Sequence, residues 1–179
     1  MKQNITILIL TLSITLGIAG CDPYNNQGNP PTQNPTIIAD SIYVIADIRK
    51  HGDYYNSGHQ VFAVDLLSQG LTYDSTMHIT GTGYNLFLSD IFVKCDSLPA
   101  GHYEMDSVAK DMTFLKGMDF EGNITGTYLL QIQEDKIQTI TLFTAGSMEI
   151  AYDSEGMKME MVLYTADSAK YKAKWSSGI

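Results

Sequence analysis

Apolar and polar residues alternate with a period close to two from Ile37 to the end of the chain. In the clearest run, residues 157–161, three methionines alternate with a lysine and a glutamate. In residues 170–175, three lysines alternate with Tyr, Ala and Trp. A period of two places successive side chains on opposite faces of a β-strand. Gly, Asn, Asp and Ser cluster between the runs, as at residues 153–156, and predict turns.

This pattern predicts an all-β domain over residues 37–179, because no stretch there has a helical apolar stripe with caps. We expect eight to ten strands in an antiparallel β-sandwich, with a closed, lipocalin-like β-barrel as the alternative. One of these strands, residues 42–48, is expected to place its four even-numbered residues, Ile, Val, Ala and Ile, on a single apolar face.

The last two runs allow more than one interpretation. Met157, Met159 and Met161 favour core packing, since methionine fills irregular gaps, although the same stripe could line a pocket for an apolar ligand. The lysines favour the solvated side of a strand. Trp175 is expected to close the core, and an exposed tryptophan at this position could instead stack on a sugar ring.

The N-terminal segment has a different pattern, in which Lys2 precedes an apolar run that ends in Ile-Ala-Gly-Cys at 18–21. The apolar run is short for a transmembrane helix and is typical of an export signal. Its end resembles the lipobox of bacterial lipoprotein signal peptides, which signal peptidase II cleaves before the cysteine. The resemblance implies a signal peptide over residues 1–20 and a palmitate-type lipid anchor on Cys21.

Residues 21–36 contain four of the five prolines and almost no apolar side chains, so we expect a flexible tether behind the lipidated cysteine. These segments together predict a lipid-anchored protein of the cell envelope, with a membrane as its first partner. We favour the outer membrane. Asp22 is discordant, because in the enterobacterial sorting rule an aspartate there retains lipoproteins at the inner membrane.

The net charge bears on the binding partner, and the cysteine content bears on disulfide formation. Removal of residues 1–20 would leave ten basic and twenty acidic side chains, a net charge of −10. Such a charge repels phosphate backbones, so nucleic acid is not an expected partner. If Cys21 carries the lipid, Cys95 has no partner for an intramolecular disulfide. Cys95 ends an apolar run and is expected to be buried and inert.

No familiar catalytic motif occurs in the sequence. There is no Gly-x-Ser-x-Gly elbow, and the glycine pair at 81–83 lacks the third glycine of a dinucleotide loop, so it predicts a close backbone approach before a strand. His51, Asp53 and His59 could meet in one loop, but a zinc site needs three or four converging ligands. We therefore expect neither enzymatic activity nor a cofactor nor a metal.

The dipeptide Asp-Ser occurs six times, whereas random placement of fourteen Asp and thirteen Ser residues would give about one. Five of the six continue with Ile, Thr, Leu, Val or Ala, which resembles the O-glycosylation sequon of Bacteroidota-type bacteria. The alternative is that Asp and Ser both favour turns. The candidate glycosylation sites are Ser41, Ser75, Ser97, Ser107 and Ser168.

Several short phrases recur in a familiar order. They are Gly-Asp-Tyr at 52–54, Leu-Pro-Ala-Gly-His-Tyr at 98–103, Gly-Thr-Tyr at 126–128, Ala-Gly-Ser-Met-Glu-Ile at 145–150 and Trp-Ser-Ser-Gly at 175–178. Over roughly residues 40–178, this order resembles the β-rich surface lipoproteins of Bacteroidota. His102 stands where their turns more often carry threonine. The resemblance implies an address and a fold, and no activity that could be carried over.

These observations favour a non-enzymatic binding or structural module of the envelope, with a glycan or an envelope protein as partner. A carrier of a small apolar ligand with a β-barrel pocket is the alternative. A hydrolase would need carboxylates or histidines that converge in one cleft. An assembly role of the fimbrial type would need a donated or accepted strand, for which the C-terminal run ending at Ile179 is the first candidate.

Overall fold

The computed structural model describes residues 37–178, and their side chains from Ile42 onward. These residues form fourteen β-strands and no helix, so the all-β prediction is confirmed for this part of the chain. In chain order the strands are β1 (Ile37–Gly52), β2 (Gln60–Ser68), β3 (Leu71–Tyr73), β4 (Ile79–Gly81), β5 (Gly83–Val93), β6 (Gly101–Asp106), β7 (Thr113–Leu115), β8 (Met118–Phe120), β9 (Asn123–Thr125), β10 (Thr127–Gln133), β11 (Lys136–Leu142), β12 (Ala145–Asp153), β13 (Gly156–Tyr164) and β14 (Lys170–Ser176).

Ten of the strands form one continuous sheet in the order β11-β10-β5-β2-β1-β14-β13-β12-β6-β7. Strand β7 also pairs with β5, where Ile91 lies opposite Phe114, and this pairing closes the eight strands from β5 to β7 into a barrel. Two pairings, β1 with β14 and β6 with β7, are parallel. The sandwich prediction is therefore wrong. A sandwich has two separate sheets, whereas here a single sheet closes on itself where β7 pairs with β5.

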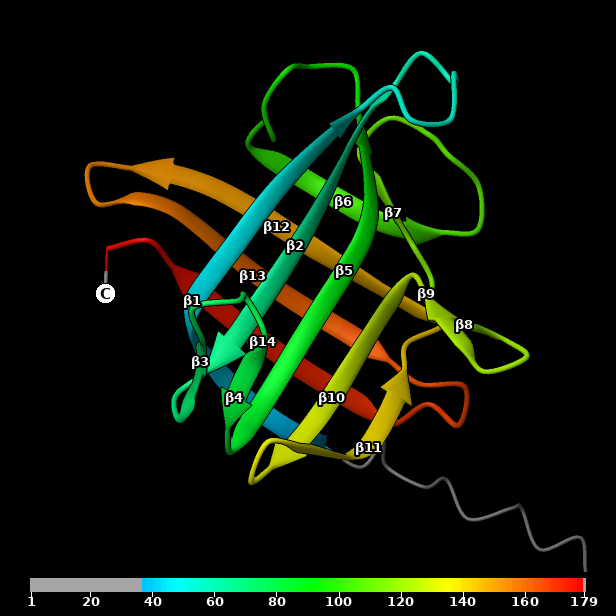
Figure 1. The fold of residues 1–179 in the computed structure, drawn as a ribbon. Coiled ribbons are helices and arrows are strands. Elements are labelled where there is room, and N and C mark those ends of the chain that lie inside the picture. The colour runs from blue at the N-terminus through cyan, green and yellow to red at the C-terminus, as the bar shows by residue number, and fades with distance from the viewer. Residues whose placement is uncertain (1–36, 179) are drawn as a thin grey trace, which may run out of the picture. The chain divides into compact units, whose positions relative to one another are not determined.

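The barrel has two walls that cross one another, as Figure 1 shows for β2 and β5 against β12, β13 and β14. We call β1, β2 and β5 the first wall, together with β10 and β11, which extend its sheet beyond the barrel, and we call β6, β7, β12, β13 and β14 the second wall. Strand β1 joins them. Its residues up to Tyr43 pair in parallel with β14, and its residues from Tyr43 onward pair antiparallel with β2.

The corner in β1 is a β-bulge at Val44, where the pairing with β2 shifts register between Tyr43 and Ile45. A bulge inserts one extra residue and bends the strand. Ile42 and Val44 are consequently 64% and 38% exposed, while Ala46 packs against the interior. The predicted single apolar face of this strand is wrong, because the bulge inverts the alternation of its side chains.

Large side chains fill the interior of the barrel. Tyr43, Tyr103 and Tyr171 are all fully buried in its core cluster, together with several phenylalanines and leucines. The hydroxyls of Tyr43 and Tyr171, from the first and last strands, hydrogen-bond to each other. The hydroxyl of Tyr103 donates to the carbonyl oxygen of Pro99 at 2.8 Å. The polar ends of these tyrosines are therefore satisfied within the core.

A second apolar cluster lies on the outer face of the first wall, where Leu67, Leu71 and Ile132 are buried together. The β3–β4 hairpin contributes to it through a tight fold of the backbone. Gly81 has a φ of +110°, and a Cβ there would lie 2.1 Å from the carbonyl oxygen of Gly70. This contact confirms the close approach predicted from the glycine pair. As a result, β2 is buried on both of its faces.

Candidate functional site

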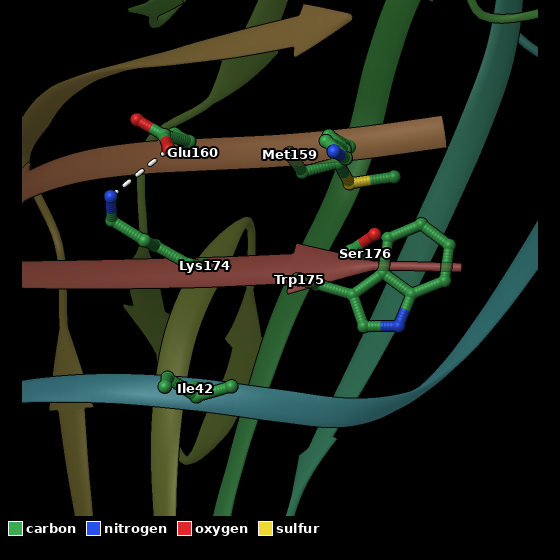
Figure 2. Close-up of a pocket in the computed structure, with 7 residues that line it drawn as sticks. Ile42, Met159, Glu160, Lys174, Trp175 and Ser176 are labelled. Carbon is green, nitrogen blue, oxygen red and sulfur yellow. Dashed lines mark hydrogen bonds and ion pairs between the residues drawn. The ribbon is translucent and has the colours of Figure 1, made fainter. Parts of the chain in front are cut away.

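An open groove of about 220 Å³ lies where β1 leaves β14. Its apolar lining consists of Ile42, Met159 and Trp175, which come from three adjacent strands. Figure 2 shows the indole of Trp175 between β14 and β1, with Met159 on one side and Ile42 on the other. The polar residues that line the groove are Lys158, Glu160, Lys174 and Ser176.

The groove exists because β14 loses its neighbour. The parallel pairing of the two strands ends where Tyr43 lies opposite Trp175, and the bulge at Val44 then turns β1 toward β2. Trp175 lies at the resulting gap, where it is partly buried and packs against the interior cluster. Ile42 forms the opposite side and is largely exposed. Both surfaces are therefore apolar and reachable from solvent.

The structure combines the two interpretations of Trp175. Its side chain closes the core at this end of the second wall, and it also lines the groove. Met159 and Met161 are fully or almost fully buried in the interior cluster, and Met157 packs against that cluster. The assignment of the methionine stripe to core packing is confirmed, and only Met159 reaches the groove.

Charged side chains surround the groove in pairs. The Lys174 ammonium lies 3.0 Å from a Glu160 carboxylate oxygen. Lys158 contacts Asp153 at 2.7 Å and Glu155 at 3.1 Å. Hydrogen bonds to these two carboxylates, that to Asp153 first, raise the pKa of Lys158. All of these groups are exposed or half-exposed, so the pairs hold the side chains only weakly and can exchange partners.

A second cluster of titratable groups lies on the outer face of the same wall. The two ring nitrogens of His102, on β6, contact the carboxylates of Glu149 and Glu104. Hydrogen bonds to Glu104 and then to Glu149 raise the pKa of His102. A protonated ring has an N–H for each carboxylate, so the arrangement works as a clamp between β6 and β12. Among residues 42–178, no group of three His, Cys, Asp or Glu side chains is placed to hold a metal ion.

A third cluster contains the buried carboxylate of Asp65, which is only 8% exposed. The buried amide of Asn85 donates to this carboxylate and also to the carbonyl oxygen of Leu66. The guanidinium of Arg49 lies 3.5 Å away, and burial is the main reason that the pKa of Asp65 is raised. Beside it, the hydroxyl of Tyr73 is buried without a hydrogen bond of normal geometry. This enclosed network lies on the outer face of the first wall and is not open to a ligand.

The remaining candidates from the sequence do not converge on a site. The carboxylate of Asp53 accepts the backbone N–H groups of Ser57 and Gly58 at 2.8 and 3.0 Å, so it shapes its own loop instead of meeting His51 and His59. Cys95 is exposed, and the prediction that it is buried is wrong. It lies just after β5 ends, where the chain has already left the apolar strand for a surface loop.

Four of the candidate glycosylation sites, Ser75, Ser97, Ser107 and Ser168, lie on exposed turns or loops. Ser41 lies within β1, opposite Ala173, and its side chain is outside the described part. The preceding aspartates often shape these turns: Asp74 accepts the N–H of Thr76 and of His78, and Asp106 accepts those of Ser107 and Val108. Turn formation thus explains Asp74 and Asp106, and glycosylation of the exposed hydroxyls stays a prediction.

Cys21, the predicted signal peptide over residues 1–20 and the predicted tether over residues 21–36 lie outside the described residues, as does Ile179. In the part that is described, no helix is long and apolar enough to cross a membrane. No family model matches the chain, and the comparisons with curated proteins and with solved structures found no match either. The groove itself therefore carries the functional argument.

Sequence reasoning found Trp175 but missed its neighbour Ile42, which lies 133 positions earlier in the numbering and beside it in the fold. The two meet through the parallel pairing of the first and last strands, which local alternation does not encode. The one available signal was that the strand of Ile42 has more apolar positions than one face can hold, so that some of them must lie outside the interior.

Proposed function

We propose that this protein is a non-enzymatic binding module of the bacterial cell envelope, anchored by a lipid on Cys21, and that the groove at Trp175 binds a carbohydrate. The observation that carries the proposal is the groove, in which an accessible indole and two other apolar side chains are bordered by charged and hydroxyl groups. This combination matches the chemistry of a sugar ring better than that of a purely apolar ligand.

A sugar ring has an apolar C–H face and polar hydroxyls around its edge. The indole face offers a large, rigid surface for the first, with the exposed Ile42 on one flank and Met159, which is buried in the core, on the other. Lysine donates hydrogen bonds, glutamate accepts them, and serine does both, so the border can bond the hydroxyls. At about 220 Å³ the groove is smaller than the ~300–1,000 Å³ typical of sites that enclose a drug-sized ligand. It suits one ring of a longer chain that continues into solvent.

A carrier of apolar ligands is a weaker candidate. The closed eight-stranded barrel fits the lipocalin-like alternative better than a sandwich, and lipocalin barrels hold a small ligand inside. Here the interior contains the fully buried Tyr43, Tyr103 and Tyr171 instead, and two of the three stripe methionines are core residues. A ligand would therefore have to displace well-packed side chains, which favours binding on the outside.

An assembly role by strand donation also has little support. Strand β14 lies between β1 and β13 and pairs with both, so releasing it would open the barrel. The exposed edge of the ten-stranded sheet is β11, whose bulge opposite Gln131 and Ile132 interrupts regular pairing and so hinders addition of a further strand.

The envelope address rests on the lipobox-like end of residues 1–21 and on the proline-rich residues that follow. We expect the protein to fractionate with the outer membrane. Mass spectrometry should show that Cys21 is the N-terminal residue of the mature protein and that it carries a lipid. Cys21→Ser should leave the chain unprocessed. An N-terminus elsewhere, or an unmodified Cys21, would contradict the anchor. The same spectra would show whether the five candidate serines carry sugar.

The groove can be tested through its own fluorescence, because Trp175 is the sole tryptophan of the chain. The full-length protein, expressed with its leader and purified from membranes in detergent, is titrated with a panel of neutral and acidic oligosaccharides. At least one should change the emission in a saturable way. Ile42→Ser, which alters an exposed residue, should weaken that binding, while Tyr54→Ala, an exposed aromatic outside the groove, should not. If no saccharide changes the emission, the proposed function is wrong.

A further inference from the structure

We infer that the groove selects a negatively charged saccharide, one whose ring carries a carboxylate, sulfate or phosphate. This inference rests on the proposed function, since it concerns the ligand of the same groove, and it depends on a separate observation. That observation is the uneven distribution of positive charge over an acidic chain.

The chain has eleven basic and twenty acidic residues, yet four of the eleven basic residues lie on β13 and β14. Three of them occupy alternate positions of β14, so they project from the same side of that strand. The residues between them, Tyr171 and Ala173, are buried in the core, which fixes the lysines on the outside. The four lysines are Lys158, Lys170, Lys172 and Lys174.

Two of these lysines line the groove itself. Lys174 and Lys158 are in contact with it, and Glu160 is the only acidic side chain in its lining. Figure 2 shows Lys174 and Glu160 joined by their ion pair beside the groove, on the side away from the indole. This exposed pair contributes little to stability, so a ligand anion can replace Glu160 as the partner of Lys174.

The positive charge continues along β14 away from the groove. Lys172 forms no ion pair with any side chain that the structure describes, and Lys170 lies with its ammonium 6.0 Å from the centre of the Tyr164 ring. Asp40 is opposite Lys172 in the register of β1, and its side chain is outside the described part. Successive lysines on one face of a strand are about 7 Å apart, so the three lysines of β14 extend the positive charge well beyond the groove.

Local charge decides this interaction despite the net charge of the molecule. Screening limits the reach of exposed charges to about 8–10 Å at physiological ionic strength, so a ligand in the groove interacts mainly with the charges around it. Lys158 and Lys174 are already paired with carboxylates there, so the unbalanced positive charge comes from Lys170 and Lys172, which form no ion pair with a described side chain. A neutral sugar would gain nothing from Lys170 and Lys172, which lie outside the groove. An acidic sugar chain that extends along β14 would gain from both, and its binding would depend on salt.

The experiment compares oligogalacturonate with its methyl ester, which has the same carbon skeleton without the charge. Binding to the full-length protein is followed by Trp175 fluorescence. We expect the acid to bind about tenfold more tightly at low salt, and the preference to shrink as salt rises from about 50 to about 500 mM. Lys170→Gln combined with Lys172→Gln, both outside the groove, should reduce the preference and leave binding of the ester unchanged. Lys136→Gln, on β11, is the matched control and should change neither.

The outcomes separate this inference from the proposed function. Equal affinity for acid and ester would overturn the charge selection and leave the carbohydrate site standing. Failure of every saccharide to bind would overturn both. A third arm uses vesicles with and without phosphatidylglycerol: lysine-dependent binding to the anionic vesicles, without saccharide binding, would assign the lysines to a membrane surface and overturn the inference. Circular dichroism of each variant must match the native spectrum, because the lysines are not core residues.

Discussion

The two walls of the barrel share one interior but differ in what covers their outer faces. In β2, on the first wall, eight of nine residues are buried, because the β3–β4 hairpin and neighbouring side chains cover the outside. In β14, on the second wall, buried residues alternate with lysines that face solvent. Strand β2 at the centre of the first wall therefore lies between two cores, whereas β14 in the second wall separates one core from solvent.

This difference decides where each kind of chemistry can occur. On the covered face, a polar group must find its partners within the protein, as Asp65 does with Asn85 and Arg49. On the open face, charged groups keep their hydration and can exchange partners with a ligand, as Lys174 can. The buried carboxylate with a raised pKa is thus a structural feature here, and the exposed lysines beside Trp175 are the groups that our proposal assigns to ligand binding.

The sharpest test of the comparison uses two neighbouring leucines of β2 that face opposite ways. Leu66 belongs to the interior cluster and Leu67 to the outer cluster, and both are fully buried. If the covered outer face is a true core, Leu66→Ala and Leu67→Ala should each lower the free energy of unfolding by about 2–5 kcal/mol. Urea denaturation measures both values.

Lys172→Ala on β14 provides the matched control for the open face, where we expect a change below about 0.5 kcal/mol. A loss for Leu67→Ala as small as that for Lys172→Ala would mean that the outer cluster is only loosely packed. The distinction between the two walls would then fail.

The next largest effect concerns Asp65 and its dependence on pH. Burial raises its pKa, although hydrogen bonds from Asn85 and the charge of Arg49 act in the opposite direction. A carboxyl whose pKa is raised by folding holds its proton more tightly in the folded state. The protein therefore loses stability as the pH rises from the ordinary aspartate pKa through the raised one.

Asp65→Asn removes this titration. As the pH rises through that window, the native protein should lose stability relative to the variant, so the unfolding free energy of the variant minus that of the native protein should increase. Urea denaturation at a series of pH values measures it, with Asp65→Ala as a control that also removes the hydrogen bonds to Asn85. A difference that stays constant with pH would show that Asp65 ionises as freely as in an unfolded chain.

The smallest effect is expected at His102. Its pKa is raised because its surroundings favour the charged form, whereas the pKa of Asp65 is raised because burial disfavours the charged form. Hydrogen bonds to Glu104 and Glu149 favour the charged ring, so its contribution to stability is complete below the ordinary histidine pKa and is lost as the pH rises through the raised one. An NMR titration of the ring should give a raised pKa, and Glu104→Gln or Glu149→Gln should lower it. An unchanged pKa in both variants would contradict the proposal that His102 holds β6 and β12 together through these carboxylates.

The alternation of residues predicted the strands well where one face meets solvent, as in residues 157–161 and 170–175. It does not reveal that β2 is buried on both faces, because Asp65 faces outward and a second cluster covers it. Closure of the barrel depends on the contact of Ile91 with Phe114 and on the first strand meeting the last. Such long-range pairings have no signature in a local period, so sandwich and barrel could not be separated from the sequence.

The candidate site was predicted in the same uneven way. Trp175 and the lysines around it were visible as a pattern within one strand, and their alternation correctly placed the lysines outside. The groove, however, depends on Ile42 and on the bulge at Val44, which only the pairing of β1 with two different strands reveals. Cys95 was misplaced because the sequence does not mark where β5 ends.

The hydrogen bond between Tyr43 and Tyr171 joins residues 128 positions apart, in the first and last strands of the barrel. A chain that is made from its N-terminus cannot complete this seam until its final residues are free. Until then β1 lacks one neighbour and the core lacks one wall, so apolar strands stay open to solvent and to other chains. Folding should accordingly be slow and late, as is usual when pairings are distant in sequence. Protection during that interval is then a requirement that the topology itself imposes on the cell.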